Sequence, residues 1–156
     1  MPDAAPERPS AAIVVDDNFD SRLIVRLTLE SLGYTVVEAE NGREGLEKMR
    51  NQAFDLLVLD LLMPEMNGYE VLNVLRKEPP QNSLLNLQNL QIVILTANAH
   101  MAMGDLMDMA DYLMVKPVDA IRFSELAKRL KQQRAVQSQP DSPALNPVER
   151  QGNEQL

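Results

Sequence analysis

Three aspartates, a threonine and a lysine stand at the ends of short apolar runs, and their types suit a site for a divalent cation and a phosphoryl group. The residues are Asp16, Asp17, Asp60, Thr96 and Lys116. Mg²⁺ prefers oxygen ligands and is commonly held by one or two carboxylates together with phosphate oxygens. A lysine ammonium is a compact charge suited to a phosphoryl oxygen, and a threonine hydroxyl can donate a hydrogen bond to the same group. Together these residue types predict a site that binds Mg²⁺ and a phosphoryl group.

The three aspartates differ in what they can contribute to such a site. Asp16 and Asp17 are adjacent, and two carboxylates this close repel one another unless a hard cation lies between them. Asp60 can add a third carboxylate oxygen or act as a nucleophile toward phosphorus. Each aspartate alone could instead be a helix N-cap or a turn residue, so the prediction depends on all three standing at strand ends together. Lys116 precedes Pro117, and bonds before proline are where cis peptides occur.

Four apolar runs directly precede these polar residues. They are rich in β-branched and aliphatic side chains and cover residues 12–15, 56–59, 92–95 and 113–115. Runs of this kind, separated by helix-like segments, are typical of strands that are buried on both faces of a parallel sheet. In open α/β sheets the ligand crevice lies beyond the carboxyl ends of the strands. The polar residues are therefore expected around one small volume.

The rest of the chain supplies the helices that such a sheet needs. A further strand is expected over 35–39, and helices over 19–32, 43–51, 69–77, 101–109 and 120–133. Strands alternating with helices predict an α/β fold, here a single domain over residues 11–133 with a doubly wound, five-stranded parallel sheet. Residues 1–10 and 134–156 have little to bury and are expected to be flexible tails. The connection 78–90 is longer than most α/β loops.

The composition excludes several classes of function. The 156 residues are 45% apolar and include 15 Lys and Arg against 23 Asp and Glu, for a formal charge of -8. An acidic chain without a long basic run is a poor candidate for binding nucleic acid through its phosphates. The absence of cysteine excludes disulfides and thiolate metal sites, and no apolar stretch approaches the roughly 20 residues of a membrane span. The first ten residues lack the pattern of a signal peptide, so a cytoplasmic protein is expected.

The site residues, taken with their neighbours, resemble the motifs of a known family. Asp16-Asp17, Asp60 with Met63-Pro64 and Asn67-Gly68, Thr96-Ala97 and Lys116-Pro117 are similar, in order and spacing, to the receiver domains of bacterial two-component response regulators. The resemblance covers about residues 11–133. It implies the (βα)5 flavodoxin-like fold of the chemotaxis regulators and a place in a phosphorelay. Residues 134–156 are too few and too polar to fold as an output domain, so a stand-alone receiver is expected.

The resemblance also implies a phosphoacceptor and a metal site. Asp60 would take a phosphoryl group from a histidine kinase or a histidine phosphotransfer protein. Asp17, Asp60 and the backbone carbonyl of Leu62 would hold Mg²⁺ directly, while Asp16 would act through water. These expectations agree with the residue types, because phosphoryl transfer depends mainly on positioning and charge neutralisation.

The remaining site residues would carry the response to phosphorylation. By resemblance, Lys116 would pair with the phosphoryl oxygens and Thr96 would move to meet them. Receivers usually carry an aromatic residue three positions before the lysine, where this chain has Leu113, and Tyr112 lies one position earlier. Because strand side chains alternate between faces, Tyr112 is predicted to face the opposite side of the sheet unless a bulge intervenes. Ordinary coupling between Thr96 and Tyr112 is therefore in question.

Three functions compete at this point. The leading one is a phosphorylation-dependent receiver that switches the binding of a protein partner. It would bind neither nucleic acid directly nor a membrane. A homodimer through the fourth helix, fifth strand and fifth helix is possible. The second is a receiver-like module that binds partners independently of phosphorylation. A phosphatase of the haloacid dehalogenase type is disfavoured, because such enzymes typically carry an Asp-x-Asp motif. Here Asp60 is followed by Leu61 and Leu62. We therefore expect a signalling protein that is not an enzyme.

Overall fold

Five parallel strands form one sheet at the centre of the computed structural model, which describes residues 8–77, 89–98, 100 and 104–137. The strand order is β2-β1-β3-β4-β5, so the chain first adds β2 on one side of β1 and then adds β3, β4 and β5 in turn on the other side. Their bounds are β1 Ala11–Val15, β2 Thr35–Ala39, β3 Leu56–Asp60, β4 Gln91–Thr96 and β5 Tyr112–Val115. This is the predicted doubly wound α/β fold.

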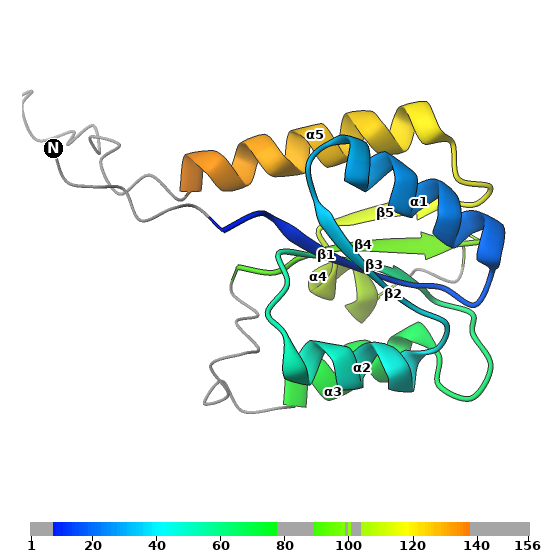
Figure 1. Cartoon of the computed structure of the whole chain (residues 1–156). Coiled ribbons are helices and arrows are strands. Elements are labelled where there is room, and N and C mark those ends of the chain that lie inside the picture. Colours follow the sequence, from blue (N-terminus) through cyan, green and yellow to red (C-terminus); the bar gives the residue numbers. More distant parts are fainter. Residues whose placement is uncertain (1–7, 78–88, 99, 101–103, 138–156) are drawn as a thin grey trace, which may run out of the picture.

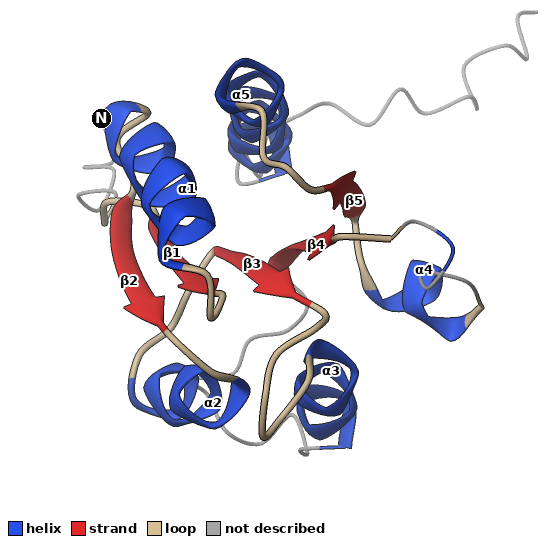
Figure 2. Ribbon diagram, turned by 90° about the vertical axis from the view of Figure 1, so that its right-hand side faces the viewer, coloured by secondary structure: helices blue, strands red, loops and turns tan. Residues whose placement is uncertain are grey.

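The helices lie on both faces of the sheet. They are α1 Phe19–Ser31, α2 Gly42–Asn51, α3 Gly68–Lys77, α4 Asp105–Met109 and α5 Ala120–Gln137. Figure 1 shows α1 and α5 together on one face, with α2 and α3 on the other. Figure 2 shows the same layers from another side, with α4 beside β5 on the face that α3 covers. A membrane span would need a longer and more apolar helix than any of those described.

Alternating strand side chains divide the buried residues into two cores. The α2–α3 core contains Ile13, Leu57, Leu59, Val71, Ile94 and Leu106, among others. The α1–α5 core contains Val14, Val25, Val58, Leu95, Phe123 and Leu130, among others. Each strand therefore contributes successive residues to opposite faces, which is why the runs are continuously apolar. The two cores hold the strand ends in fixed positions.

Two helix boundaries differ by more than one residue from the sequence-based expectation. The fourth helix was expected over 101–109. Residues 101–103 of this range lie outside the described residues, and the described helix begins at Asp105, after Gly104, whose φ of 83° is outside the helical region. The fifth helix continues past 133 to Gln137. Its added turn carries Arg134, which forms an ion pair with the buried carboxylate of Asp55. This contact gives the last turn a tertiary partner that the local sequence does not reveal.

The expected tails and the long connection lie mostly outside the described residues. Residues 1–7, 138–156 and 78–88 are not described, so the expectations for them stay predictions. Of the N-terminal segment, Arg8 is described, and its guanidinium lies 2.8 Å from Asp55. The same Asp55 also accepts a 2.8 Å hydrogen bond from the Ala11 amide. Asp55 at the start of β3 thus binds both Arg8 and Arg134, at the end of the sheet opposite Asp60.

Candidate functional site

Two of the predicted aspartates lie side by side because their strands are neighbours. Asp16 follows β1 directly and Asp60 is the last residue of β3, and β1 pairs with β3 in parallel. Both are almost completely buried, whereas Asp17 is exposed. Carboxylate oxygens of Asp16, Asp17 and Asp60 all lie within 4.8 Å of one another. The predicted acidic cluster therefore exists, with one carboxylate open to solvent.

Lys116 reaches this cluster from the far strand β5. Its Nζ lies 2.8 Å from Oδ2 of Asp16 and 3.2 Å from Oδ2 of Asp60. The Lys116–Pro117 peptide bond is cis. The ammonium therefore bridges two buried carboxylates that would otherwise repel each other.

Thr96 ends β4, next to Asp60, and is fully buried. Its hydroxyl donates to the backbone carbonyl of Asn98 at 3.0 Å and accepts from the Asn98 amide at 3.1 Å. Both hydrogen bonds stay within the loop that follows the strand. Thr96 is thus at the predicted edge of the sheet, with its hydroxyl engaged by Asn98.

Burial and neighbouring charges shift the pKa values of the paired groups. Burial, followed by the charge of Asp16, raises the pKa of Asp60 to about 6, although Lys116 and the Leu62 amide act in the opposite direction. For Lys116, burial disfavours the charged form, but the hydrogen bonds and charges of Asp16 and Asp60 outweigh it and raise its pKa. The carboxylates of Asp16 and Asp60 are therefore close together in a region with little solvent, where their charges interact strongly.

The charges and donor atoms of this cluster fit a hard divalent cation. Three carboxylates face one ammonium, so the ionised cluster has an excess of two negative charges. Asp16 Oδ2 is buried and accepts no hydrogen bond from any described residue, although the Lys116 Nζ lies close to it. All available ligands are oxygens, which Mg²⁺ prefers. The residues present therefore suit Mg²⁺.

The loop after β3 folds back against the end of the strand. The Leu62 amide donates to Oδ1 of Asp60 at 3.3 Å, while the Leu62 side chain is 48% exposed. The Gly68 amide donates to the Leu61 carbonyl at 3.0 Å. A Cβ at Gly68 would lie 2.5 Å from the carbonyl oxygen of Asp60, so only glycine fits this close approach. The loop therefore places the Leu62 backbone directly beside Asp60.

One residue of the site was not found from the sequence. Arg22 of α1 is buried, and its Nη1 donates to the backbone carbonyl of Asp16 at 2.8 Å. A signal was present: Arg22 shares the helical stripe of the core residues Val25 and Leu29, three and seven positions later. A charged residue on a buried stripe needs polar partners, and here the acidic cluster supplies one.

Comparison with known proteins identifies the family that carries this arrangement. The family model of the response regulator receiver domain matches residues 12–131. The chain belongs to the response-regulator receiver family. The predicted fold and family are therefore confirmed. Receiver domains bind Mg²⁺ in an acidic pocket, and this structure has a cluster of three aspartates.

Individual relatives are found in several kinds of two-component protein. The chain is 41% identical over 99 residues to the sensor protein EvgS of Escherichia coli K12, an alignment that covers 64% of this chain and 8% of EvgS. The response regulator TrrA of Thermotoga maritima, solved in complex with Mg²⁺-BeF, is 31% identical with a TM-score of 0.65, covering 78% of this chain and 98% of that structure. The chemotaxis regulator CheY4 of Vibrio cholerae is 26% identical with a TM-score of 0.68, covering 79% and 99%. The likeness to EvgS thus concerns a small part of a longer protein.

The aromatic position of β5 agrees with the prediction from strand alternation. Leu113 packs against the α2–α3 core, the face that includes Leu106 of α4. Tyr112 packs against the α1–α5 core on the opposite face. The pairing of β4 with β5 is regular, with Ile94 opposite Leu113 and Val93 opposite Tyr112, so no bulge changes the register. Tyr112 therefore lies on the face away from α4.

Proposed function

We propose that this receiver accepts a phosphoryl group on Asp60 from a phosphorylated histidine of a histidine kinase or phosphotransfer protein. The observation that carries the proposal is the buried Asp60 carboxylate, which lies 3.2 Å from the Lys116 ammonium and beside two further carboxylates. Such a site would stabilise the charge that gathers on the phosphoryl oxygens. The relatives in sensor kinases and regulators support a place in two-component signalling. The proposal also places the protein in the cytoplasm, where such a phosphoryl donor would act.

The transfer itself would need little from the protein beyond positioning. A carboxylate oxygen of Asp60 forms the new bond to phosphorus while the bond from phosphorus to the donor imidazole nitrogen breaks, and the electron pair returns to that nitrogen. Lys116, already held by two carboxylates, would pair with the incoming phosphoryl oxygens. The Leu62 amide would keep the Asp60 side chain oriented through its hydrogen bond to Oδ1.

The acidic residues would hold the cation that this reaction uses. We assign Asp17, Asp60 and the backbone carbonyl of Leu62 as direct ligands of Mg²⁺, with Asp16 acting through water. Bound Mg²⁺ would neutralise charge on the carboxylates and on the phosphoryl oxygens. The exposure of Asp17 supports its role as a direct ligand, because a cation arriving from solvent meets this carboxylate first.

Phosphorylation would then be passed on to a protein partner through Thr96. To reach a phosphoryl group on Asp60, the Thr96 hydroxyl would have to leave its two hydrogen bonds with Asn98. That movement would reorganise the loop that leads toward α4 and so alter the surface presented to a partner. A homodimer through α4, β5 and α5 is one form that such a partner could take.

Intact mass measurement tests this function directly. The chain is incubated with acetyl phosphate or phosphoramidate, with and without Mg²⁺, beside Asp60→Asn and the control Asp20→Asn. Asp20 is exposed in the first turn of α1 and outside the acidic cluster. We expect one added phosphoryl group in the wild type and the control, and none without metal or in Asp60→Asn. A folded wild type that gains nothing would contradict the proposal and favour a module that binds its partner independently of phosphorylation.

A further inference from the structure

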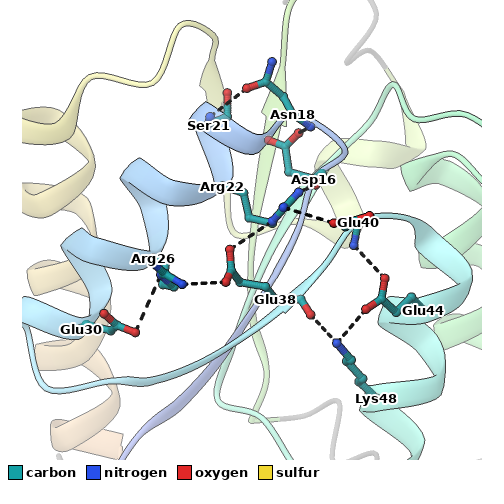
Figure 3. Close-up of polar contacts among 10 residues, drawn as sticks. All are labelled: Asp16, Asn18, Ser21, Arg22, Arg26, Glu30, Glu38, Glu40, Glu44 and Lys48. Atoms are coloured by element: carbon teal, nitrogen blue, oxygen red, sulfur yellow. Dashed lines mark hydrogen bonds and ion pairs between the residues drawn. The ribbon is translucent and has the colours of Figure 1, made fainter.

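Arg22 connects the acidic cluster to strand β2 through a set of short polar contacts (Figure 3). Its side chain is 8% exposed, and its Nη1 donates to the Asp16 carbonyl oxygen at 2.8 Å. Its Nε donates to Glu38 at 3.1 Å, and its Nη2 lies 3.6 Å from Glu40. A planar guanidinium with fixed donor directions suits such a bridging position.

The carbonyl that Arg22 holds belongs to the peptide between Asp16 and Asp17. Asp16 is held by two further hydrogen bonds: the Asn18 amide donates to its Oδ1 at 2.9 Å, and its own amide donates to the Ala39 carbonyl at 3.1 Å. Asp17 differs from Asp16 in this respect. Among the described residues, the Asp17 carboxylate has no hydrogen bond or ion pair. The direction of the Asp17 side chain is therefore set by its backbone, and Arg22 fixes the peptide that precedes it.

We propose that Arg22 is a positioning residue for the cation site: it orients the Asp16–Asp17 peptide and thereby presents the Asp17 carboxylate to Mg²⁺. This inference rests on the proposed Mg²⁺ site and adds a residue to it that does not touch the cation. Residues that orient the direct ligands of a metal commonly change its affinity when they are replaced.

Glu38 of β2 holds the Arg22 guanidinium in place. Its two carboxylate oxygens accept from Arg22 Nε and, at 2.9 Å, from Arg26 Nη1. Its backbone carbonyl accepts from Lys48 Nζ of α2 at 2.6 Å. Glu38 is therefore anchored through both its side chain and its backbone, and Arg22 gains a fixed support on β2.

The charge of Arg22 and its positioning contacts should have opposite effects on metal affinity when Arg22 is replaced. A guanidinium close to the cluster repels a divalent cation, so removing its charge alone would tighten metal binding. Loss of positioning would weaken metal binding instead, because the Asp17 carboxylate would no longer be held in one direction. A purely structural role would lower the stability of the fold and leave the metal affinity of the folded protein unchanged.

The matched variants are Arg22→Met and Arg26→Met. Arg26 lies one helical turn further along α1 and shares Glu38, but it has no contact with Asp16 among the described contacts. Mn²⁺, which also binds oxygen ligands, is titrated into each protein, free Mn²⁺ is followed by electron paramagnetic resonance, and Mg²⁺ is used as the competitor. We expect the dissociation constants of Arg22→Met to rise about 10-fold, and those of Arg26→Met to stay within about twofold of the wild type because no metal-orienting contact is lost.

The outcomes separate this inference from the proposed function. If the wild type itself does not bind Mn²⁺ or Mg²⁺, the cation site of the proposed function is wrong. If the wild type binds and folded Arg22→Met binds equally or more tightly, the positioning role is wrong while the site stands. Should Arg22→Met fail to fold by circular dichroism, Glu38→Gln decides: weaker binding than in Arg26→Met supports the positioning role, and equal binding overturns it.

Discussion

The ammonium of Lys116 lies 3.2 Å from the carboxylate of Asp60 although their strands, β5 and β3, are separated by β4. The lysine side chain spans that strand and also contacts Asp16 at 2.8 Å. Among the described residues, Lys116 is the only cation that pairs with both buried carboxylates. In the metal-free protein Lys116 neutralises part of the charge that Mg²⁺ would neutralise when bound.

Replacement of this lysine should destabilise the metal-free protein and strengthen metal binding. Lys116→Met leaves Asp16 and Asp60 buried without their cation, which should lower the free energy of unfolding by about 3 kcal/mol. Because the ammonium also repels Mg²⁺, its removal should lower the Mg²⁺ dissociation constant. Urea unfolding at several Mg²⁺ concentrations measures both effects. Equal destabilisation at zero and saturating Mg²⁺ would contradict this account.

The raised pKa of Asp60 predicts a specific pH dependence of stability without metal. Its pKa is raised from 3.8 to about 6 in the folded protein, so the folded state binds the proton more tightly than the unfolded state. The resulting stabilisation is present below pH 4 and is lost as the pH rises through about 6. Asp60→Asn has no such group, so its stability relative to wild type should increase between pH 4 and pH 7, by up to about 3 kcal/mol. Urea unfolding of both proteins in chelator, at several pH values, tests this; a constant difference would contradict it.

The same pKa should govern metal affinity. Protonated Asp60 is a poor ligand for a cation, so the Mg²⁺ dissociation constant should rise as the pH falls below about 6. Mn²⁺ titrations between pH 5 and pH 8 measure this change, with the Asp20→Asn variant as the control for an acidic residue outside the cluster. A dissociation constant that does not change across this range would show that Asp60 stays ionised throughout.

The Leu62 side chain should prolong the phosphorylated state. It stands two residues after Asp60 and is apolar, so it offers no group that could orient water toward an acyl phosphate on that residue. Leu62→Asn should shorten the half-life of the phosphorylated protein several-fold, because an amide can hold a water molecule near phosphorus. Leu62→Ala, which removes the side chain without adding a polar group, separates orientation of water from loss of cover. An unchanged half-life in Leu62→Asn would show that Leu62 only covers the loop.

Tyr112 should not be needed for the response to phosphorylation. It packs against the α1–α5 core, whereas α4 lies over the opposite face. We expect Tyr112→Phe to keep the changes in amide chemical shift that beryllofluoride causes over residues 104–116, and Thr96→Ala to reduce them. Loss of these changes in Tyr112→Phe would mean that the tyrosine hydroxyl acts from the α1–α5 side.

The apolar pattern of the sequence was enough to predict the fold and to assign four polar residues to one edge of the sheet. Apolar runs of parallel strands end where the sheet ends, so Asp16, Asp60, Thr96 and Lys116 could be assigned to one edge before any coordinates were known. Strand alternation likewise placed Leu113 and Tyr112 on opposite faces. These predictions succeed because burial on both faces imposes a local pattern that can be read along the chain.

The polar contacts between different helices and strands could not be predicted from the sequence. The carbonyl of Asp16 is held by Arg22 of α1, and Asp55 pairs with Arg8 and Arg134 from opposite ends of the described chain. Such partners depend on the distance and direction between elements, and the helical period marks only that Arg22 is buried. The hydrogen bonds of the Thr96 hydroxyl similarly depend on the path of the following loop, which places the backbone of Asn98 within reach. Local pattern thus brings the strand-end residues to one edge of the sheet, and packing between elements decides which groups, such as the Arg22 guanidinium, hold them there.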